Sequence, residues 1–337
     1  MSGIMMMVIA IVVLGGAYLL YGRYLQNKWG IDPKAKTPAY EMEDGVDYVP
    51  ADTNVVFGHQ FASIAGAGPI NGPIQAAIFG WLPVMLWILI GGVFFGAVQD
   101  FASMYASVKN KGRTIGYIIE AYIGKLGKKL FLLFCWLFCI LVVAAFADVV
   151  AGTFNGFVAD NAGTVTRVAA NGAVATTSML FIIEAVGLGF FLKYSKFNKW
   201  INTAVAILLL VLAIALGLKF PVYVSLGTWH IIIFAYILVA SVAPVWALLQ
   251  PRDYLNSYLL IFMIVGAVIG VFAANPSCNL KAFTSFNVDG QYMFPILFVT
   301  IACGAVSGFH SLVSSGTASK QIKNEKNMLP VSFGAML

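Results

Sequence analysis

Residues 58–73 read GHQFASIAGAGPINGP, with four glycines and two prolines in sixteen positions. The remaining side chains are mostly small or apolar, and the run lies where a membrane span would begin. Glycine and proline at this density predict a helix that is broken over about Ala65–Pro73. Non-helical backbone is tolerated at membrane depth where it is buried in protein or lines a polar cavity. Because discontinuous helices mark the binding sites of transporters, the run predicts a broken helix at 58–80 that binds a ligand.

The composition of the chain predicts an all-α polytopic membrane protein. The 337 residues are 60% hydrophobic and 10% charged, with a mean hydropathy of +0.88, whereas roughly a quarter of a soluble domain is charged. The net charge of +6 does not indicate nucleic acid, because basic residues of membrane proteins collect in cytoplasmic loops. The four cysteines lack neighbours that would complete a metal site. We therefore expect no metal, cofactor or nucleic-acid partner.

The apolar runs predict about nine spans, since a span needs about 20 mostly apolar residues. They lie near residues 4–24, 58–80, 82–107, 129–156, 174–192, 200–218, 229–249, 257–274 and 294–316.

The basic residues predict the orientation of these spans. With an outside N-terminus, 17 of the 20 basic residues fall on the cytoplasmic side, and the exceptions are Arg167, Lys219 and Lys281. This asymmetry is the positive-inside pattern of membrane proteins. The stretch 25–57 is then a cytoplasmic loop.

The last residues turn apolar again. After SKQIKNEKNM the sequence continues as LPVSFGAML and stops at Leu337. This pattern is typical of the opening of a tenth span, so we expect residues 1–337 to form one incomplete transmembrane domain. A genuine short C-terminus is the alternative.

Ionisable residues inside apolar runs are functional candidates, because each costs about 2.5–3.5 kcal/mol at the centre of a membrane helix. The candidates for proton coupling are His59, Asp148, Glu184 and His310. Asp100 ends the apolar run of the third span, where it is either a further functional candidate or a helix-end residue that faces water or pairs with loop lysines. We interpret Asp100, Arg252 and Asp253 as structural residues at helix ends.

The ninth span is rich in small residues, which permit close helix packing and also offer hydroxyls to an ion or a substrate. Both interpretations remain open for Ser311, Ser314 and Ser315. Pro244 interrupts the seventh span, five spans after the first break, and two such interruptions are typical of an inverted repeat of the LeuT type. The predicted substrate-binding residues are Ala65, Gly66, Ala67, Gly68, Pro69, Gly72, Pro73, Pro244, Ser311, Ser314 and Ser315.

Five blocks spread over residues 44–322 carry a resemblance to a known family. They read DGVDYVPADTNVVFGHQFASIAGAGPINGP, GAVQDF, KGRTIG, PVWALLQPRDYL and TIACGAVSGFHSLVSSGTASKQI. These blocks closely resemble the carbon starvation protein A (CstA) family. The resemblance implies an inner-membrane transporter for peptides or pyruvate, proton-coupled in its pyruvate carriers, and distantly related to the amino acid–polyamine–organocation superfamily.

The chain departs from this family in two places. Many members read GHHFA where this chain reads GHQFA, so a proton role for a second histidine does not apply at Gln60. Members also continue with further spans past the equivalent of Leu337.

Together these observations predict a secondary transporter for a small carboxylate or short peptide, coupled to a proton or another cation. A membrane nutrient sensor that moves nothing is the alternative, and an intramembrane enzyme ranks third because no catalytic constellation is specified. The sequence leaves the substrate, the coupling ion and the oligomeric state open.

Overall fold

The computed structural model describes residues 2–45, 47–159, 165–194, 199–242 and 249–337. They are mostly helical and divide into two compact units, Met1–Lys129 with Phe262–Leu337 (unit 1) and Leu130–Ile261 (unit 2). Each unit is described by itself below. The predicted single domain over 1–337 stays a prediction.

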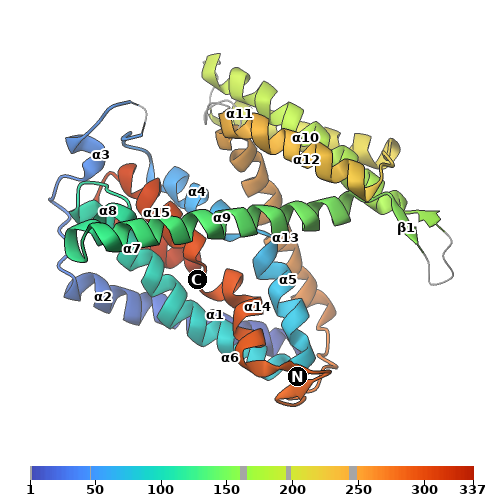
Figure 1. The fold of residues 1–337 in the computed structure, drawn as a ribbon, viewed down its shortest axis with the longest axis horizontal. Coiled ribbons are helices and arrows are strands. Elements are labelled where there is room, and N and C mark those ends of the chain that lie inside the picture. Colours follow the sequence, from blue (N-terminus) through green and yellow to red (C-terminus); the bar gives the residue numbers. More distant parts are fainter. Residues whose placement is uncertain (1, 46, 160–164, 195–198, 243–248) are drawn as a thin grey trace. The chain divides into compact units, whose positions relative to one another are not determined.

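Unit 1 contains the N-terminal helices and the C-terminal segment (Figure 1). Its α-helices are α1 (Gly3–Gly16), α2 (Arg23–Lys28), α3 (Pro38–Glu41), α4 (Thr53–Ile64), α5 (Ala67–Ala76), α6 (Trp81–Gly91), α7 (Val98–Lys109), α8 (Ile115–Tyr122), α14 (Met293–Ala305) and α15 (Gly308–Gly316). Its π-helical segments are η1 (Ala17–Gly22), η3 (Gly92–Ala97) and η6 (Leu329–Gly334). Short 3-10 turns are η2 (Ala77–Phe79), η4 (Ala318–Lys320) and η5 (Glu325–Asn327), and β3 (Asn287–Val288) pairs with β4 (Gln291–Tyr292).

Unit 2 is built from long apolar helices. It holds α10 (Ala169–Tyr194), α11 (Lys199–Lys219), α12 (Leu226–Val242) and the hairpin of β1 (Phe157–Ala159) with β2 (Val165–Arg167). Two helices, α9 (Lys125–Phe154) and α13 (Leu249–Ala274), continue from one unit into the other. Ala185 and Ala206 are fully buried where α10 packs on α11. Such small side chains let apolar helices approach closely.

A sharp turn at Gly80 separates the second helical region from the third. Gly80 has φ 103°, a conformation that favours glycine. A Cβ there would lie 2.6 Å from the carbonyl oxygen of Ala282. The chain then runs as one helical region from Trp81 to Lys109, with η3 between α6 and α7.

The main core of unit 1 lies between its N-terminal helices and its C-terminal segment. Phe101, Met104 and Phe333 are fully buried in it. Tyr21 packs on Phe94 at 5.3 Å and on Phe333 at 6.4 Å between ring centroids. The apolar LPVSFGAML stretch is therefore core of this unit, with Leu329–Gly334 in η6.

Five helices of the described chain are long and apolar enough to cross a membrane. They are Gly3–Lys28, Trp81–Lys109, Lys125–Phe154, Ala169–Leu188 and Met293–Lys320, and shorter apolar helices occur at Ala204–Lys219, Leu226–Val242 and Tyr258–Ala274. All eight overlap predicted spans, and the remaining predicted span, 58–80, is the broken region of α4 and α5. Polytopic membrane character is thus confirmed, while the count of nine spans stays a prediction.

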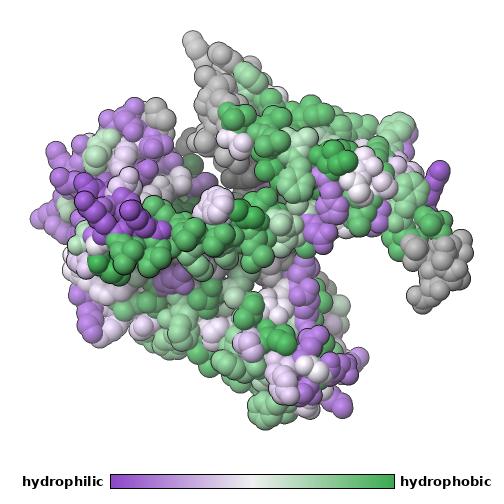
Figure 2. Space-filling view, in the orientation of Figure 1, coloured by the Kyte–Doolittle hydropathy of each residue, from purple (hydrophilic) through white to green (hydrophobic). Residues whose placement is uncertain are grey.

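The surface agrees with this class of protein. Figure 2 shows hydrophilic side chains gathered over α3 and α8 of unit 1. Large apolar side chains are exposed on the long helices, including Leu137, Ile140 and Leu141 of α9. Apolar surface of this extent is suited to lipid or to further protein.

Candidate functional site

The first predicted helix break is present, but it is narrower than the sequence suggests. Helix α4 ends at Ile64, Ala65 and Gly66 leave helical geometry, and α5 begins at Ala67. The prediction of non-helical backbone through Gly72 is wrong. Pro69 lies in the first turn of α5, where backbone N–H groups have no intrahelical acceptor, so its missing N–H costs little there. The helix also begins at Thr53, earlier than the predicted start at residue 58.

A second break lies in the ninth predicted span. Helix α14 ends at Ala305, Val306 (φ −151°, ψ 68°) and Ser307 (φ −89°, ψ 127°) are non-helical, and α15 begins at Gly308. The sequence analysis assigned the second interruption to Pro244 instead. Pro244 lies outside the described residues, so that assignment is untested.

The two breaks lie side by side. Helix α5 packs on α14, and α4 packs on α15 (Figure 1). A Cβ added to Gly304 would lie 3.0 Å from the Cα of Pro69, and one added to Gly68 would overlap Cys303. Across the other halves, Gln60 Nε2 donates to the carbonyl oxygen of His310 at 3.3 Å. The helix before each break therefore packs against the helix after the other break. The two broken helices contact each other on both sides of their breaks.

A third helical region reaches the second break. Gly96, in the π-helical segment η3, lies against the carbonyl group of Ala305, the last residue of α14. A Cβ at Gly96 would overlap this carbonyl oxygen. Single-turn π segments are frequent at functional sites, and this one brings backbone close to the freed end of α14.

Open space and unsatisfied donors remain beside both breaks. A Cβ at Gly66 or at Gly308 would meet no atom within 4 Å, unlike one at Gly68 or Gly304. No side chain caps the N-terminus of α5 or of α15. The first N–H groups of a helix lack intrahelical partners and carry partial positive charge, so they attract anions. Two uncapped N-termini at neighbouring breaks form an environment suited to a carboxylate.

One face of α15 is polar and buried. His310, Ser311, Ser314 and Ser315 are each 5% exposed or less. Ser314 Oγ donates to the carbonyl oxygen of Asp100 at 2.9 Å, and Gln99 Nε2 donates to Ser311 Oγ at 3.1 Å. The serine hydroxyls thus fasten α15 to α7 and to its own backbone, as the packing interpretation expects.

Asp100 does not occupy the exposed helix end that the sequence suggested. It lies inside the helical region Trp81–Lys109, and its side chain is 1% exposed. Its Oδ2 atom has no hydrogen-bond partner among the described residues. The loop lysine nearest in sequence, Lys109, binds Glu325 instead. His310 Nδ1 and Gln60 Oε1 are likewise buried without a partner among the described residues.

The remaining predicted ionisable residues are His59 in unit 1 and Asp148, Glu184, Arg252 and Asp253 in unit 2. His59 is half-buried in α4, and its carbonyl oxygen accepts from Ser63 Oγ at 2.9 Å. In unit 2, Asp148 Oδ1 lies 3.1 Å from His230 Nε2, although the Asp148 side chain is 75% exposed. Glu184 is half-buried in α10. Arg252 and Asp253 lie near the start of α13.

His230 is a residue that the sequence analysis did not include among the candidates. Its pairing with Asp148 joins α12 to α9. A signal was available, because an acid and a histidine in two apolar helices are natural partners. The neighbouring Trp229 is 2% exposed and packs on Phe154 at 5.1 Å.

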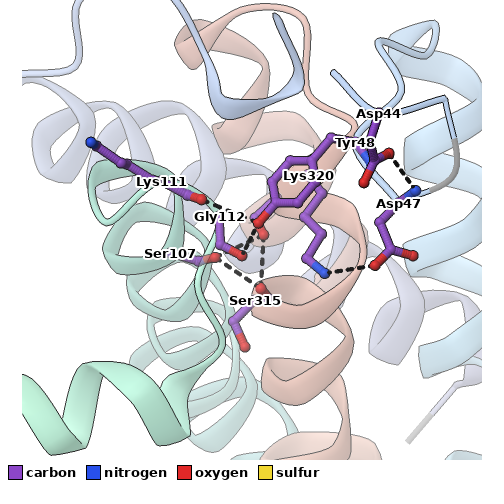
Figure 3. Close-up of polar contacts among 9 residues, drawn as sticks. Asp44, Asp47, Tyr48, Ser107, Lys111, Gly112, Ser315 and Lys320 are labelled. Carbon is purple, nitrogen blue, oxygen red and sulfur yellow. Dashed lines mark hydrogen bonds and ion pairs between the residues drawn. The ribbon is translucent and has the colours of Figure 1, made fainter. Parts of the chain in front are cut away.

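Charged loops close one end of unit 1. This loop network consists of the ion pairs Lys109–Glu325 (2.8 Å), Lys323–Asp52 (2.7 Å) and Lys320–Asp47 (3.5 Å). In Figure 3, Tyr48 lies between Lys320 and the carbonyl groups of Lys111 and Gly112. The hydrogen bond that Lys323 Nζ donates to Asp52 Oδ1 raises the pKa of Lys323. The network joins the loop after α2 to the ends of α7 and α15.

The described residues hold no group of three or more histidine, cysteine or acidic side chains that could bind a metal ion. The site is therefore defined by backbone and hydroxyl groups at two helix breaks. These features belong to a mostly helical chain with several apolar helices long enough to cross a membrane and two adjacent broken helices.

Comparison with known proteins identifies the family. A family profile described as "Carbon starvation protein CstA" matches residues 2–337, so the chain belongs to this family. The chain is 37% identical over 340 residues to a peptide transporter CstA of Escherichia coli, covering 95% of this chain and 46% of that protein. It is 36% identical over 355 residues to a peptide transporter CstA of Bacillus subtilis, covering 100% and 56%.

A relative with a different named substrate matches equally well. The chain is 36% identical over 352 residues to the pyruvate/proton symporter BtsT of Escherichia coli, covering 100% of this chain and 47% of that protein. The chain thus spans about half the length of these curated relatives. All three names describe transport rather than catalysis. No solved structure matches the chain.

Proposed function

We propose that this chain forms the substrate-binding part of a secondary active transporter that imports peptides or pyruvate in response to carbon starvation. The observation that carries the proposal is the pair of helix breaks at Ala65–Gly66 and Val306–Ser307, packed against each other in one unit. Discontinuous helices whose half-helix N-termini point at an anionic group form transporter binding sites. The names of the relatives favour transport over the sensor and enzyme alternatives.

The chemistry of the breaks favours a substrate with a carboxylate. A peptide and pyruvate share this group, and the relatives named for both match the chain with nearly equal identity. The uncapped N-termini of α5 and α15 would bind the carboxylate through backbone N–H groups. Recognition by backbone explains why no buried arginine is needed at the breaks.

For pyruvate, which carries one net negative charge, coupling to a proton follows from the charge of the substrate. Import of one negative charge opposes a negative-inside potential by about 2.3 kcal/mol per 100 mV. One proton per anion cancels this opposition, and a relative is named as a proton symporter. We therefore favour proton coupling over another cation.

The wider architecture belongs to the same proposal. The distribution of the basic residues agrees with nine spans, an outside N-terminus and a loop network that faces the cytoplasm. The inner membrane and a LeuT-like inverted repeat complete this arrangement, with α4/α5 as one of its broken helices.

The test uses two glycines that both have room for a larger side chain. In vesicles that contain the protein, uptake of labelled pyruvate and of labelled alanyl-alanine is measured for Gly66→Leu and for the control Gly58→Leu. A Cβ at either position meets no atom within 4 Å, so both variants are expected to fold. Gly66→Leu fills the space at the first break and should abolish uptake, whereas Gly58→Leu, within α4, should retain it. Equal uptake by both variants would refute a site at the breaks.

A further inference from the structure

Asp100 is held in the core of unit 1 next to the second helix break. Its carbonyl oxygen accepts from Ser314 on α15, and the preceding Gln99 donates to Ser311 on the same helix. Helix α15 starts directly after the break at Val306–Ser307. A movement of α15 at this break therefore changes the surroundings of Asp100.

Except for His310, the following charged and titratable groups around α7 form ion pairs with residues other than Asp100. Among the elements that pack on α7, η4 contributes Lys320, which pairs with Asp47, and α8 contributes Glu120, which pairs with Lys128. Segments η3 and η6 contain no titratable side chain. Helix α15 contributes His310, which is 1% exposed. At the C-terminal end of α7, Lys109 forms an ion pair with Glu325.

Among the described residues, Asp100 is therefore buried without a cationic partner. An isolated carboxylate in a protein interior costs several kcal/mol, and loss of its charge removes that cost. A carboxyl group that lacks a fixed cationic partner is free to alternate between the protonated and ionised forms when its access to water changes. A purely structural position of this kind would be filled at lower cost by an amide.

We propose that Asp100 is the carboxyl group that binds and releases the coupling proton, at the contact between α7 and α15. The proposal rests on the proton-coupled transport proposed above and assigns its proton to a residue outside the set His59, Asp148, Glu184 and His310. One O–H bond forms when the carboxylate takes a proton from water on one side. The same bond breaks when the proton returns to water on the other side, while substrate occupies the neighbouring breaks.

The transport test separates coupling from binding. Labelled pyruvate or alanyl-alanine is added outside vesicles that contain wild-type protein, Asp100→Asn or the control Asp52→Asn. For one proton per substrate molecule, a gradient of one pH unit supports about tenfold accumulation, which corresponds to ~1.4 kcal/mol. Asp100→Asn should lose this accumulation and the accompanying proton uptake, while exchange of labelled for unlabelled substrate continues. Asp52→Asn, in the exposed pair with Lys323, should accumulate substrate like wild type.

A spectroscopic test does not depend on transport. Infrared spectra of the purified protein at neutral pH should contain a protonated-carboxyl C=O band that is absent from Asp100→Asn and present in Asp52→Asn. If neither probe is exchanged by the wild type, the transport proposal fails, and the infrared band still decides the assignment of Asp100. An unchanged band, or accumulation that survives in Asp100→Asn, would overturn the assignment. Loss of exchange together with accumulation would also contradict it, since Asp100 would then act in binding or folding.

Discussion

Two buried acidic side chains in the described part of unit 1 have opposite environments. Glu325 accepts two hydrogen bonds from Lys109 Nζ at 2.8 and 2.9 Å and a third from the backbone N–H of Asp32 at 2.9 Å. Asp100, equally buried, leaves Oδ2 without a partner in the described chain. Burial alone therefore does not distinguish a structural carboxylate from a functional one. The number of hydrogen-bond donors that the fold places around a buried carboxylate distinguishes the two.

The largest effect is expected at Glu325. Glu325→Ala removes the acceptor shared by Lys109 and Asp32, and loss of one partner from a buried pair costs about 3–5 kcal/mol. Because the Lys109 side chain is 35% exposed and can rehydrate, we expect a loss of about 2–4 kcal/mol. The measurement is the thermal melting temperature of the purified protein in detergent.

Two further variants sharpen the contrast between the acids. Lys109→Met should lower the melting temperature as well, and the double variant should lose less than the sum, since the two residues form one interaction. Asp100→Asn should melt at or above the wild-type temperature, because it removes a charge that has no partner. A lower melting temperature for Asp100→Asn than for Glu325→Ala would reverse our interpretation of the two acids.

A medium effect is expected where the broken helices touch. A Cβ at Gly72 would lie 2.5 Å from the carbonyl oxygen of Thr300 on α14. Gly72→Ala therefore forces α5 and α14 apart, and overpacking of this kind costs about 1–3 kcal/mol. The matched control Gly58→Ala meets open space within α4 and should gain about 0.5–1 kcal/mol. If both variants melt alike, α5 and α14 are not in close contact in the protein.

The sequence predicted some of these features because they depend on local chemistry. Glycine and proline density predicted the break at Ala65–Gly66, and the small residues of the ninth span predicted its close packing. The break at Val306–Ser307 has no proline, so local propensity gave no clear sign of it. The helical form of Ala67–Gly72 was missed because its glycines serve contact with α14, which is a tertiary property.

The environments of Glu325 and Asp100 could not be predicted from the sequence, because they also depend on tertiary contacts. Lys109 and Glu325 are 216 positions apart, and nothing in either segment specifies the other. Asp100 looked like a helix end because the apolar run stops there, although the helix continues to Lys109. Its burial arises from α15 and η6, which pack on α7 from the far end of the chain.

The smallest effect is expected at an exposed pair that lies outside both environments. Glu120 on α8 accepts from Lys128 Nζ at 2.6 Å, and this hydrogen bond, with the charges of Lys128, Lys125 and Arg113, lowers the pKa of Glu120. A lowered pKa in the folded state means that the pair stabilises the fold at any pH above the ordinary glutamate value of about 4.3. The contribution is lost as the pH falls through the lowered pKa.

Glu120→Gln should therefore change the melting temperature of the protein little at pH 7. It should also make the melting temperature fall less as the pH is lowered into the acidic range. The Glu120 side chain is 32% exposed, so the small difference at pH 7 should vanish in about 1 M salt, where the Debye length is ~3 Å. Glu325→Gln provides the comparison, because a pair buried among loops is screened far less. If salt removed the effect of Glu325→Gln as completely as that of Glu120→Gln, Glu325 would be a surface acid. The contrast with Asp100 would then rest on exposure rather than on partners.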